Sequence, residues 1–163
     1  MQERELRVGI GDMKFTRGTG KIITYALGSC IGISFWDPFL HLGALLHIML
    51  PERHDAEEGN IYKYADSGIH ETIRKLSAFG MVKSRTVVKI AGGAKMFEIR
   101  GNAEFGNIGS RNTFMVKKIL QEENMRISAE DTGGAFARTM ILDIESGDVA
   151  IRNAFRLCLA TGC

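Results

Sequence analysis

The stretch Ile31-Gly32-Ile33-Ser34-Phe35-Trp36, followed by residues 41–50 (HLGALLHIML), decides the fold. Both segments are rich in apolar, β-branched or aromatic side chains, which is typical of strands, and Asp37-Pro38 between them is a turn signal. We therefore expect an antiparallel hairpin with a four-residue loop over residues 37–40. In that register Trp36 pairs with His41, and Cys30 lies directly opposite His47 with Cβ atoms about 4.5–5.5 Å apart.

The two faces of this hairpin differ in character, because side chains alternate along a strand. One face is wholly apolar and carries Ile31, Ile33, Phe35, Leu42, Ala44, Leu46, Ile48 and Leu50. The other face carries Cys30 and His47 beside small residues such as Gly32, Ser34 and Gly43. A one-residue slip would mix the two sets. We expect the first face to form a core and the second to be the floor of a site with room for a substrate.

A thiol and an imidazole in this arrangement are the minimum for nucleophilic attack on an acyl carbon. His47 can take the proton of Cys30, and the imidazolium that forms lowers the pKa of the thiol. The backbone N–H groups of the turn Gly28-Ser29-Cys30 are candidate donors to the oxyanion, so Gly28 and Ser29 are candidate substrate-binding residues. The alternative interpretation is a buried structural cysteine and a core histidine.

Six sequence blocks extend this pattern along the chain, roughly from Val8 to Arg152. They are Thr24-x-x-Leu27-Gly28-Ser29-Cys30, His47-x-Met49-Leu50-Pro51, Lys63-Tyr64-Ala65-Asp66, residues 90–97 (IAGGAKMF), residues 107–112 (NIGSRN) and Glu130-Asp131-Thr132-Gly133-Gly134. Together the blocks resemble the CheD family, the chemoreceptor glutamine deamidases of bacterial chemotaxis. Ser110 departs from the alanine that we expect at its position.

The resemblance implies that Thr24 joins Cys30 and His47 as a catalytic residue by orienting the imidazole. It also implies a Cys-His thiol amidohydrolase that converts specific protein glutamine side chains to glutamate and releases ammonia. The cytoplasmic region of chemoreceptors would be the substrate, and a CheC-type phosphatase a further partner. Two alternatives stay open: a non-enzymatic binding module that regulates such a phosphatase, and a thiol transglutaminase or protease.

This chemistry needs no metal and no organic cofactor, and the sequence contains no cluster of ligand residues that predicts one. Cys158 and Cys163 have no nearby His or Cys that would complete a zinc set, and we interpret both as structural. The sequence after Cys30 favours a strand rather than the helix that a nucleophile elbow requires, which argues against a hydrolase of that fold.

Composition is that of a small globular protein, with 163 residues, 45% hydrophobic and 25% charged. We expect a single domain over residues 1–163, with no recognisable motif after about residue 153. A net charge of +2 and the lack of long basic runs argue against nucleic-acid binding. No stretch approaches the ~20 apolar residues that span a bilayer, and the N-terminus does not look like a signal peptide. We therefore expect no membrane insertion and a cytoplasmic location.

Periodicity and turn signals predict the other elements, with further strands near residues 6–10, 21–26, 86–91, 126–129, 140–144 and 149–153. One predicted helix ends at Gly80 and has apolar residues at helical spacing, namely Ile61, Ala65, Ile69, Ile73 and Leu76. Ser110 or Asn112 would cap a second helix that buries Phe114, Val116, Ile119 and Leu120. The fold class that we expect is α/β, a layered sandwich with a mixed, largely antiparallel sheet and two main helices.

Overall fold

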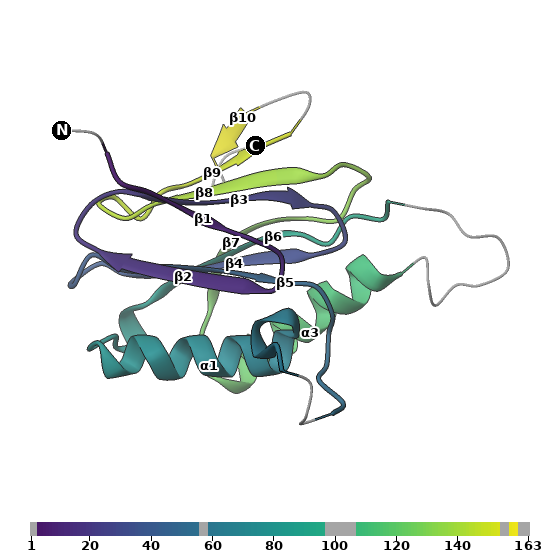
Figure 1. Cartoon of the computed structure of the whole chain (residues 1–163), viewed down its shortest axis with the longest axis horizontal. Helices are drawn as coiled ribbons and strands as arrows, with labels where there is room; N and C mark the ends of the chain where they lie inside the picture. The colour runs from purple at the N-terminus through teal and green to yellow at the C-terminus, as the bar shows by residue number, and fades with distance from the viewer. Residues whose placement is uncertain (1–2, 56–58, 97–106, 154–156, 160–163) are drawn as a thin grey trace, which may run out of the picture.

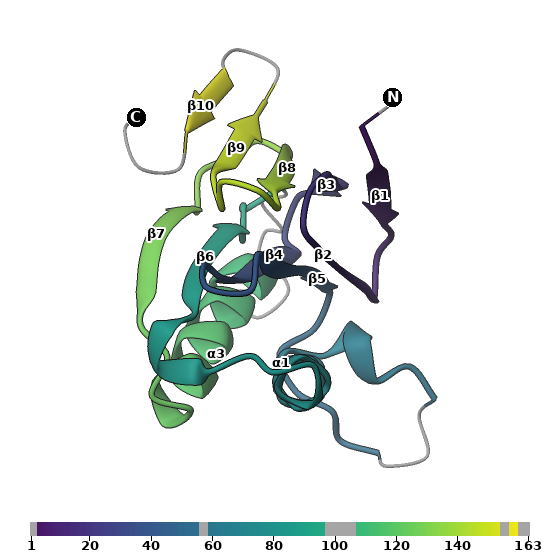
Figure 2. The same ribbon diagram turned by 90° about the vertical axis from the view of Figure 1, so that its left-hand side faces the viewer.

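Two five-stranded sheets and a layer of two helices make up the fold, in a computed structural model that describes residues 3–55, 59–96, 107–153 and 157–159 (Figure 1). The outer sheet has the strand order β1-β3-β8-β9-β10, and the inner sheet has the order β2-β5-β4-β6-β7. The inner sheet lies between the outer sheet and the helices (Figure 2). The expected α/β layered sandwich is therefore confirmed, with two mixed sheets where we expected one.

The outer sheet consists of β1 (Glu5–Val8), β3 (Lys21–Leu27), β8 (Arg138–Asp143), β9 (Val149–Arg152) and β10 (Leu157–Leu159). Only the β1–β3 pair is parallel among these strands. β3 contains a bulge, because its register with β8 shifts between Thr24 and Leu27 and Ala26 has a φ of 59°. The bulge lets Thr24 and Leu27 both face the inner sheet although they are three positions apart.

The inner sheet consists of β2 (Asp12–Arg17), β5 (Leu42–Ile48), β4 (Ile31–Asp37), β6 (Val87–Gly92) and β7 (Ile127–Thr132). Its pairs are antiparallel except for β6–β7. β2, which was not predicted from the sequence, pairs with β5 and places Asp12 opposite His47.

The helices α1 (Ala65–Ala78) and α3 (Ile108–Glu122) cover the apolar face of the inner sheet, and two 3₁₀ turns, η1 (Ile61–Lys63) and η2 (Lys83–Arg85), flank α1. Gly80, with a φ of 100°, follows the end of α1 as predicted. The expected caps of the second helix are wrong, because α3 begins before Ser110 and Asn112 lies inside it. Phe114 is 67% exposed rather than buried.

The β4–β5 register differs from the prediction by two residues. Gly32 pairs with His47 and Trp36 with Gly43, around a loop over residues 38–41. The cause is Asp37, which stays in β4 while its carboxylate accepts hydrogen bonds from the backbone N–H groups of two loop residues at 3.0 and 3.4 Å. A slip of two residues preserves the side-chain alternation, and the predicted apolar face does pack against the helices.

The other face of this hairpin is not the open floor that we expected. It is covered by the outer sheet, and its glycines make room for side chains of β8 and of the residue that follows β8. A Cβ on Gly32 would lie 2.8 Å from Met140 Sδ, and one on Gly43 would lie 2.6 Å from Ile144 Cδ1. Side-chain alternation shows which residues share a face, but it does not show what covers that face.

Candidate active site

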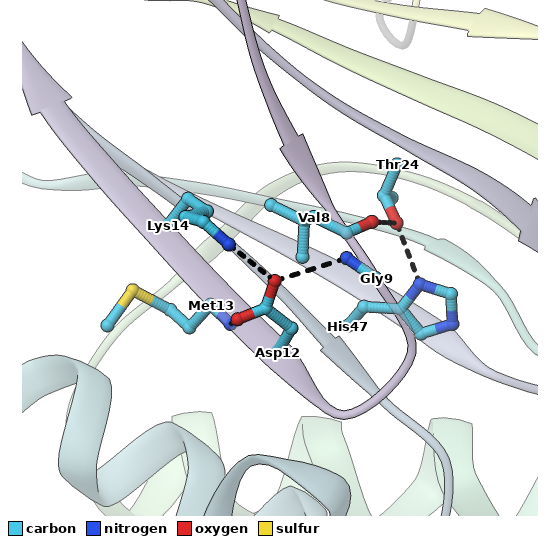
Figure 3. Close-up of polar contacts among 7 residues, drawn as sticks. All are labelled: Val8, Gly9, Asp12, Met13, Lys14, Thr24 and His47. Atoms are coloured by element: carbon cyan, nitrogen blue, oxygen red, sulfur yellow. Dashed lines mark hydrogen bonds and ion pairs between the residues drawn. The ribbon is translucent and has the colours of Figure 1, made fainter.

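Thr24 and His47 come from different sheets and meet in the interior between them. Both residues are completely buried. Thr24 Oγ1 lies 2.7 Å from His47 Nδ1, and Figure 3 shows this contact between β3 and β5. The structure thus brings together the imidazole and the hydroxyl that the resemblance assigned to it.

The hydrogen bonds of Thr24 determine the tautomer of His47. Thr24 Oγ1 donates to the carbonyl oxygen of Val8 at 2.8 Å (Figure 3). A hydroxyl has one proton and a carbonyl can only accept, so His47 Nδ1 must donate to Thr24 Oγ1. The lone pair of the neutral imidazole is then on Nε2. This buried Nε2 has no hydrogen-bond partner within the described part of the chain, so it is available to accept a proton.

Burial keeps the imidazole neutral. Desolvation lowers the pKa of His47 from 6.5 to about 4, and the negative charge of Asp12 opposes this shift. The Asp12 carboxylate is held by the backbone N–H of Gly9 at 3.2 Å and by the ammonium of Lys14 at 2.8 Å (Figure 3). Sequence reasoning missed Asp12, because only the pairing of the unpredicted strand β2 with β5 brings it beside His47.

Cys30 lies in the bend between β3 and β4 and is 9% exposed. Burial raises the pKa of its thiol, while the backbone N–H of Cys30 itself acts in the opposite direction. The thiol and the imidazole are therefore both neutral at pH 7 in this state. The structure thus raises the pKa of this thiol, whereas the sequence led us to expect that His47 would lower it.

Cys30 and His47 lie on the same face of the inner sheet but are not opposite each other. Gly32 occupies the position opposite His47, so Cys30 is its diagonal neighbour. Diagonal residues on one face are separated by about 7–8 Å, which long side chains can span. Because Nε2 has no partner within the described residues, the thiol does not hydrogen-bond to it here.

Within the described loops and turns, one of the three N–H groups of the turn Gly28-Ser29-Cys30 makes a backbone hydrogen bond and two do not. The N–H of Gly28 donates to the carbonyl of Ala26 at 3.0 Å and is therefore occupied. The N–H groups of Ser29 and Cys30 make no backbone hydrogen bond in the described loops and turns. Gly28 has a steric role as well, since a Cβ there would lie 3.2 Å from Met96 Cγ.

A second glycine turn supports the cysteine turn from behind. Gly93 N–H donates to the Cys30 carbonyl at 2.9 Å, and Ala94 N–H donates to the Gly28 carbonyl at 2.8 Å. Gly92 has a φ of 114°, and a Cβ there would lie 2.1 Å from the Cys30 carbonyl oxygen. The described part of the sequence block over residues 90–97 therefore packs against the backbone of the cysteine turn. Phe97, the last residue of this block, lies outside the described residues.

Arg138, the first residue of β8, connects this glycine turn to the outer sheet. Its guanidinium donates to the carbonyl of Gly92 at 2.7 Å and to that of Gly133, and it pairs with the Asp131 carboxylate at 3.2 Å. The Asp131–Gly134 block thus has a structural role around the same glycine turn.

Neither a metal cluster nor a membrane helix is found in the described ranges. No three His, Cys, Asp or Glu side chains there are grouped so that they could hold a metal ion. No helix among these residues is long and apolar enough to cross a membrane.

A thiol, an imidazole with an available Nε2 and an orienting hydroxyl, placed between two sheets, define a candidate thiol-hydrolase site. The family described as CheD chemotactic sensory transduction matches residues 49–153. The "Probable chemoreceptor glutamine deamidase CheD" of Moorella thermoacetica is 43% identical over 96% of this chain and 95% of its own length. Proteins of the same name from Syntrophomonas wolfei and Pyrococcus abyssi are 42% and 41% identical over 90% and 91% of the chain, and cover 92% and 91% of their own lengths. The chain belongs to the CheD family.

The family match begins at Met49 and so does not include Thr24, Cys30 or His47. The Moorella relative, in contrast, aligns over nearly the whole chain. The assignment of these three residues therefore depends on their geometry.

Proposed function

We propose that this protein is a chemoreceptor glutamine deamidase of bacterial chemotaxis, with Cys30 as nucleophile, His47 as general base and acid, and Thr24 as the residue that orients the imidazole. The observation that carries the proposal is the Thr24–His47 contact, which leaves Nε2 unprotonated on the sheet face that also carries Cys30. The names of the relatives supply the substrate, a glutamine of a chemoreceptor.

The reaction starts from the neutral pair. Nε2 takes the thiol proton as the sulfur attacks the carboxamide carbon, so no thiolate has to form in advance. The C–N bond then breaks while Nε2–H protonates the departing nitrogen. Ammonia is released, and a glutamyl thioester remains on Cys30. Water attacks this thioester while Nε2 removes its proton, and the thiol is regenerated as glutamate departs. The net reaction consumes one water and releases one ammonia.

The surrounding groups stabilise the charges that develop. When Nε2 is protonated, the imidazolium donates from Nδ1 to Thr24 and is stabilised by the nearby negative charge of Asp12. The N–H groups of Ser29 and Cys30 are the candidate donors to the oxyanion. Cys30 reaches Nε2 by side-chain movement when substrate binds, since catalytic hydrogen bonds are often loose in unliganded enzymes.

The substrate would approach past two exposed methionines. Met49 follows the strand of His47 and Met96 lies against Gly28, and each is 41% exposed. Methionine adapts well to apolar protein surfaces. We propose that this edge contacts the cytoplasmic region of a chemoreceptor in the bacterial cytoplasm. A CheC-type phosphatase that covers the same edge would compete with the receptor.

Mass spectrometry of a chemoreceptor cytoplasmic fragment tests the function. We expect a glutamine-to-glutamate mass change that requires Cys30 and releases ammonia. Cys30→Ala should abolish this change, whereas Cys163→Ala, the matched removal of another thiol, should not. Incorporation of an added amine would instead indicate a transglutaminase, and chain cleavage a protease. Phosphatase binding without any mass change would indicate a binding module.

A further inference from the structure

Asn112 is a completely buried polar residue in the second turn of α3, a position where apolar side chains are usual. Its Nδ2 donates two hydrogen bonds of 2.9 Å, one to the carbonyl of Ser29 and one to the carbonyl of Met49. Ser29 immediately precedes the candidate nucleophile, and Met49 lies two residues after His47. One side chain therefore connects the backbones beside both candidate catalytic residues.

The ladder between β4 and β5 explains why an amide is needed there. The last pair of this ladder is Ile31 with Ile48, and the two carbonyls lie just beyond it. Carbonyls only accept hydrogen bonds, so they cannot satisfy each other, whereas a primary amide has two N–H donors. Beyond this last pair, the side chain of Asn112 replaces the backbone hydrogen bond that would continue the pairing. It therefore connects the two segments where the pairing of β4 with β5 ends.

This bridge also determines the direction of the Cys30 N–H. The Ser29 carbonyl and the Cys30 N–H belong to one planar, trans peptide group and point in opposite directions. Because Asn112 holds the carbonyl, the N–H of Cys30 points away from α3. The same N–H lowers the pKa of the Cys30 thiol, in opposition to the effect of burial. An oxyanion that forms when this sulfur attacks a carbonyl would develop near that N–H.

The bridge leaves one polar atom unsatisfied. Asn112 Oδ1 is buried and has no hydrogen-bond partner among the described residues. An unpaired buried acceptor destabilises a fold, and an apolar side chain of similar size would avoid this cost. Such a replacement would, however, lose the two hydrogen bonds that Asn112 Nδ2 donates.

We propose that Asn112 is a positioning residue: it locks the Ser29–Cys30 peptide so that the Cys30 N–H serves as an oxyanion donor, and it ties the cysteine turn to the strand of His47. The catalytic part of this inference rests on the proposed deamidation. The positioning itself concerns Cys30 alone and can be measured without substrate.

The test compares Asn112→Ala, which removes both donors, with Asn112→Ser, which keeps one donor and serves if the alanine variant does not fold. Thr72→Val is the matched control, because Thr72 is equally buried on α1 and donates to the Gly68 carbonyl at 2.8 Å. Circular dichroism and thermal melting establish folding. Iodoacetamide labelling of Cys30 across a pH range and deamidation kinetics are then measured on each variant.

In Asn112→Ala the pH midpoint of Cys30 labelling should rise by about one unit, which corresponds to tenfold slower labelling below it. We expect kcat to fall about 10²-fold, as for the loss of an oxyanion donor, with KM little changed. Asn112→Ser should lie between this variant and wild type, and Thr72→Val should match wild type in both measurements.

Unchanged midpoints and kcat in a folded Asn112 variant would overturn the positioning role. So would equal changes in Thr72→Val, which would indicate a general loss of stability. If wild type failed to deamidate any receptor but the labelling midpoint still shifted, the proposed function would fall and the positioning of Cys30 would stand.

Discussion

At the scale of single residues, Thr24 determines what His47 can do. A histidine held by a neutral hydroxyl differs from one held by a carboxylate, because the hydroxyl orients the ring without adding charge. The Val8 carbonyl completes the arrangement, since it takes the only hydroxyl proton. The hydrogen bonds that link Val8, Thr24 and His47 therefore leave Nε2 as a base, and no charged group in the described part of the protein hydrogen-bonds to the imidazole nitrogens.

Thr24→Val tests this arrangement, because valine has the shape of threonine but can neither accept from Nδ1 nor donate to Val8. We expect kcat to fall about tenfold, less than the ~10²–10⁴-fold loss for His47→Ala, which removes the proposed base and acid. Nitrogen-detected NMR of the imidazole should show a growing Nε2-protonated tautomer.

Thr72→Val provides the control for Thr24→Val, since it makes the same chemical change at a buried site on the other side of the inner sheet. A folded Thr24→Val protein with the wild-type tautomer and wild-type kcat would show that the hydroxyl does not orient His47.

At the scale of elements, the site depends on close approach between backbones. At the end of β6, Gly92 packs directly on the carbonyl of Cys30, and the following Gly93 packs against α3. A Cβ on Gly93 would lie 2.2 Å from Thr113 Oγ1, and one on Gly109 would lie 2.5 Å from the Ala94 carbonyl oxygen. Glycines at these contacts let α3 reach the cysteine turn, and this approach puts Asn112 within hydrogen-bond distance of Ser29.

Gly92→Ala should weaken this contact. The new Cβ would overlap the Cys30 carbonyl oxygen, a backbone atom that cannot rotate away, so overpacking of about 1–3 kcal/mol adds to the cost of a positive φ. We expect a lower free energy of unfolding in urea and a lower kcat in the protein that remains folded.

Gly18→Ala is the matched control for Gly92→Ala. Gly18 has a similar φ of 97°, but no atom lies within 4 Å of the position that a Cβ would take there, so only the backbone strain is shared. Equal destabilisation of the two variants would show that contact with Cys30 contributes nothing.

At the scale of the whole molecule, the candidate site occupies the interior between two sheets. Cys30 belongs to the apolar cluster that joins these sheets, together with Leu27, Leu45 and Met140. Titratable groups in such a place are desolvated, which raises the pKa of Cys30 and lowers that of His47. The same burial that keeps Nε2 unprotonated therefore makes the stability of the fold depend on pH.

Stability should fall as the pH decreases from about 6.5 to about 4. In this window the unfolded state binds a proton at His47 while the folded state does not, because burial lowers the pKa of His47 to about 4. The free energy of unfolding then rises with pH, and the full contribution of this residue is about 3 kcal/mol. Urea denaturation at several pH values measures it.

His47→Asn is the comparison for the pH measurement, because it retains a polar side chain but removes the titrating group. Its free energy of unfolding should depend less on pH in this window than that of wild type. Parallel pH dependence in the two proteins would contradict a buried, neutral His47.

The interior site also explains how far the sequence could predict it. The alternation in residues 31–36 and 42–48 correctly assigned Cys30 and His47 to one face and the apolar residues to the other, because side-chain alternation is a local property. The two-residue error in register came from Asp37, whose contacts with the loop N–H groups and with Arg85 at 2.7 Å hold it in β4. A propensity for turns does not reveal such contacts.

What the sequence by itself determined is the local pattern: nearly all of the strands except β2, the two helices, most of their buried residues, and the blocks that resemble the CheD family. Only the tertiary structure decided that a second sheet covers the Cys30 face, that Asp12 lies beside His47, and that Asn112 is a buried bridge rather than a helix cap. The physical reason is that these features depend on contacts between distant segments, such as Asn112 with Ser29 and Met49. Local propensity carries no information about which distant group will satisfy a buried donor.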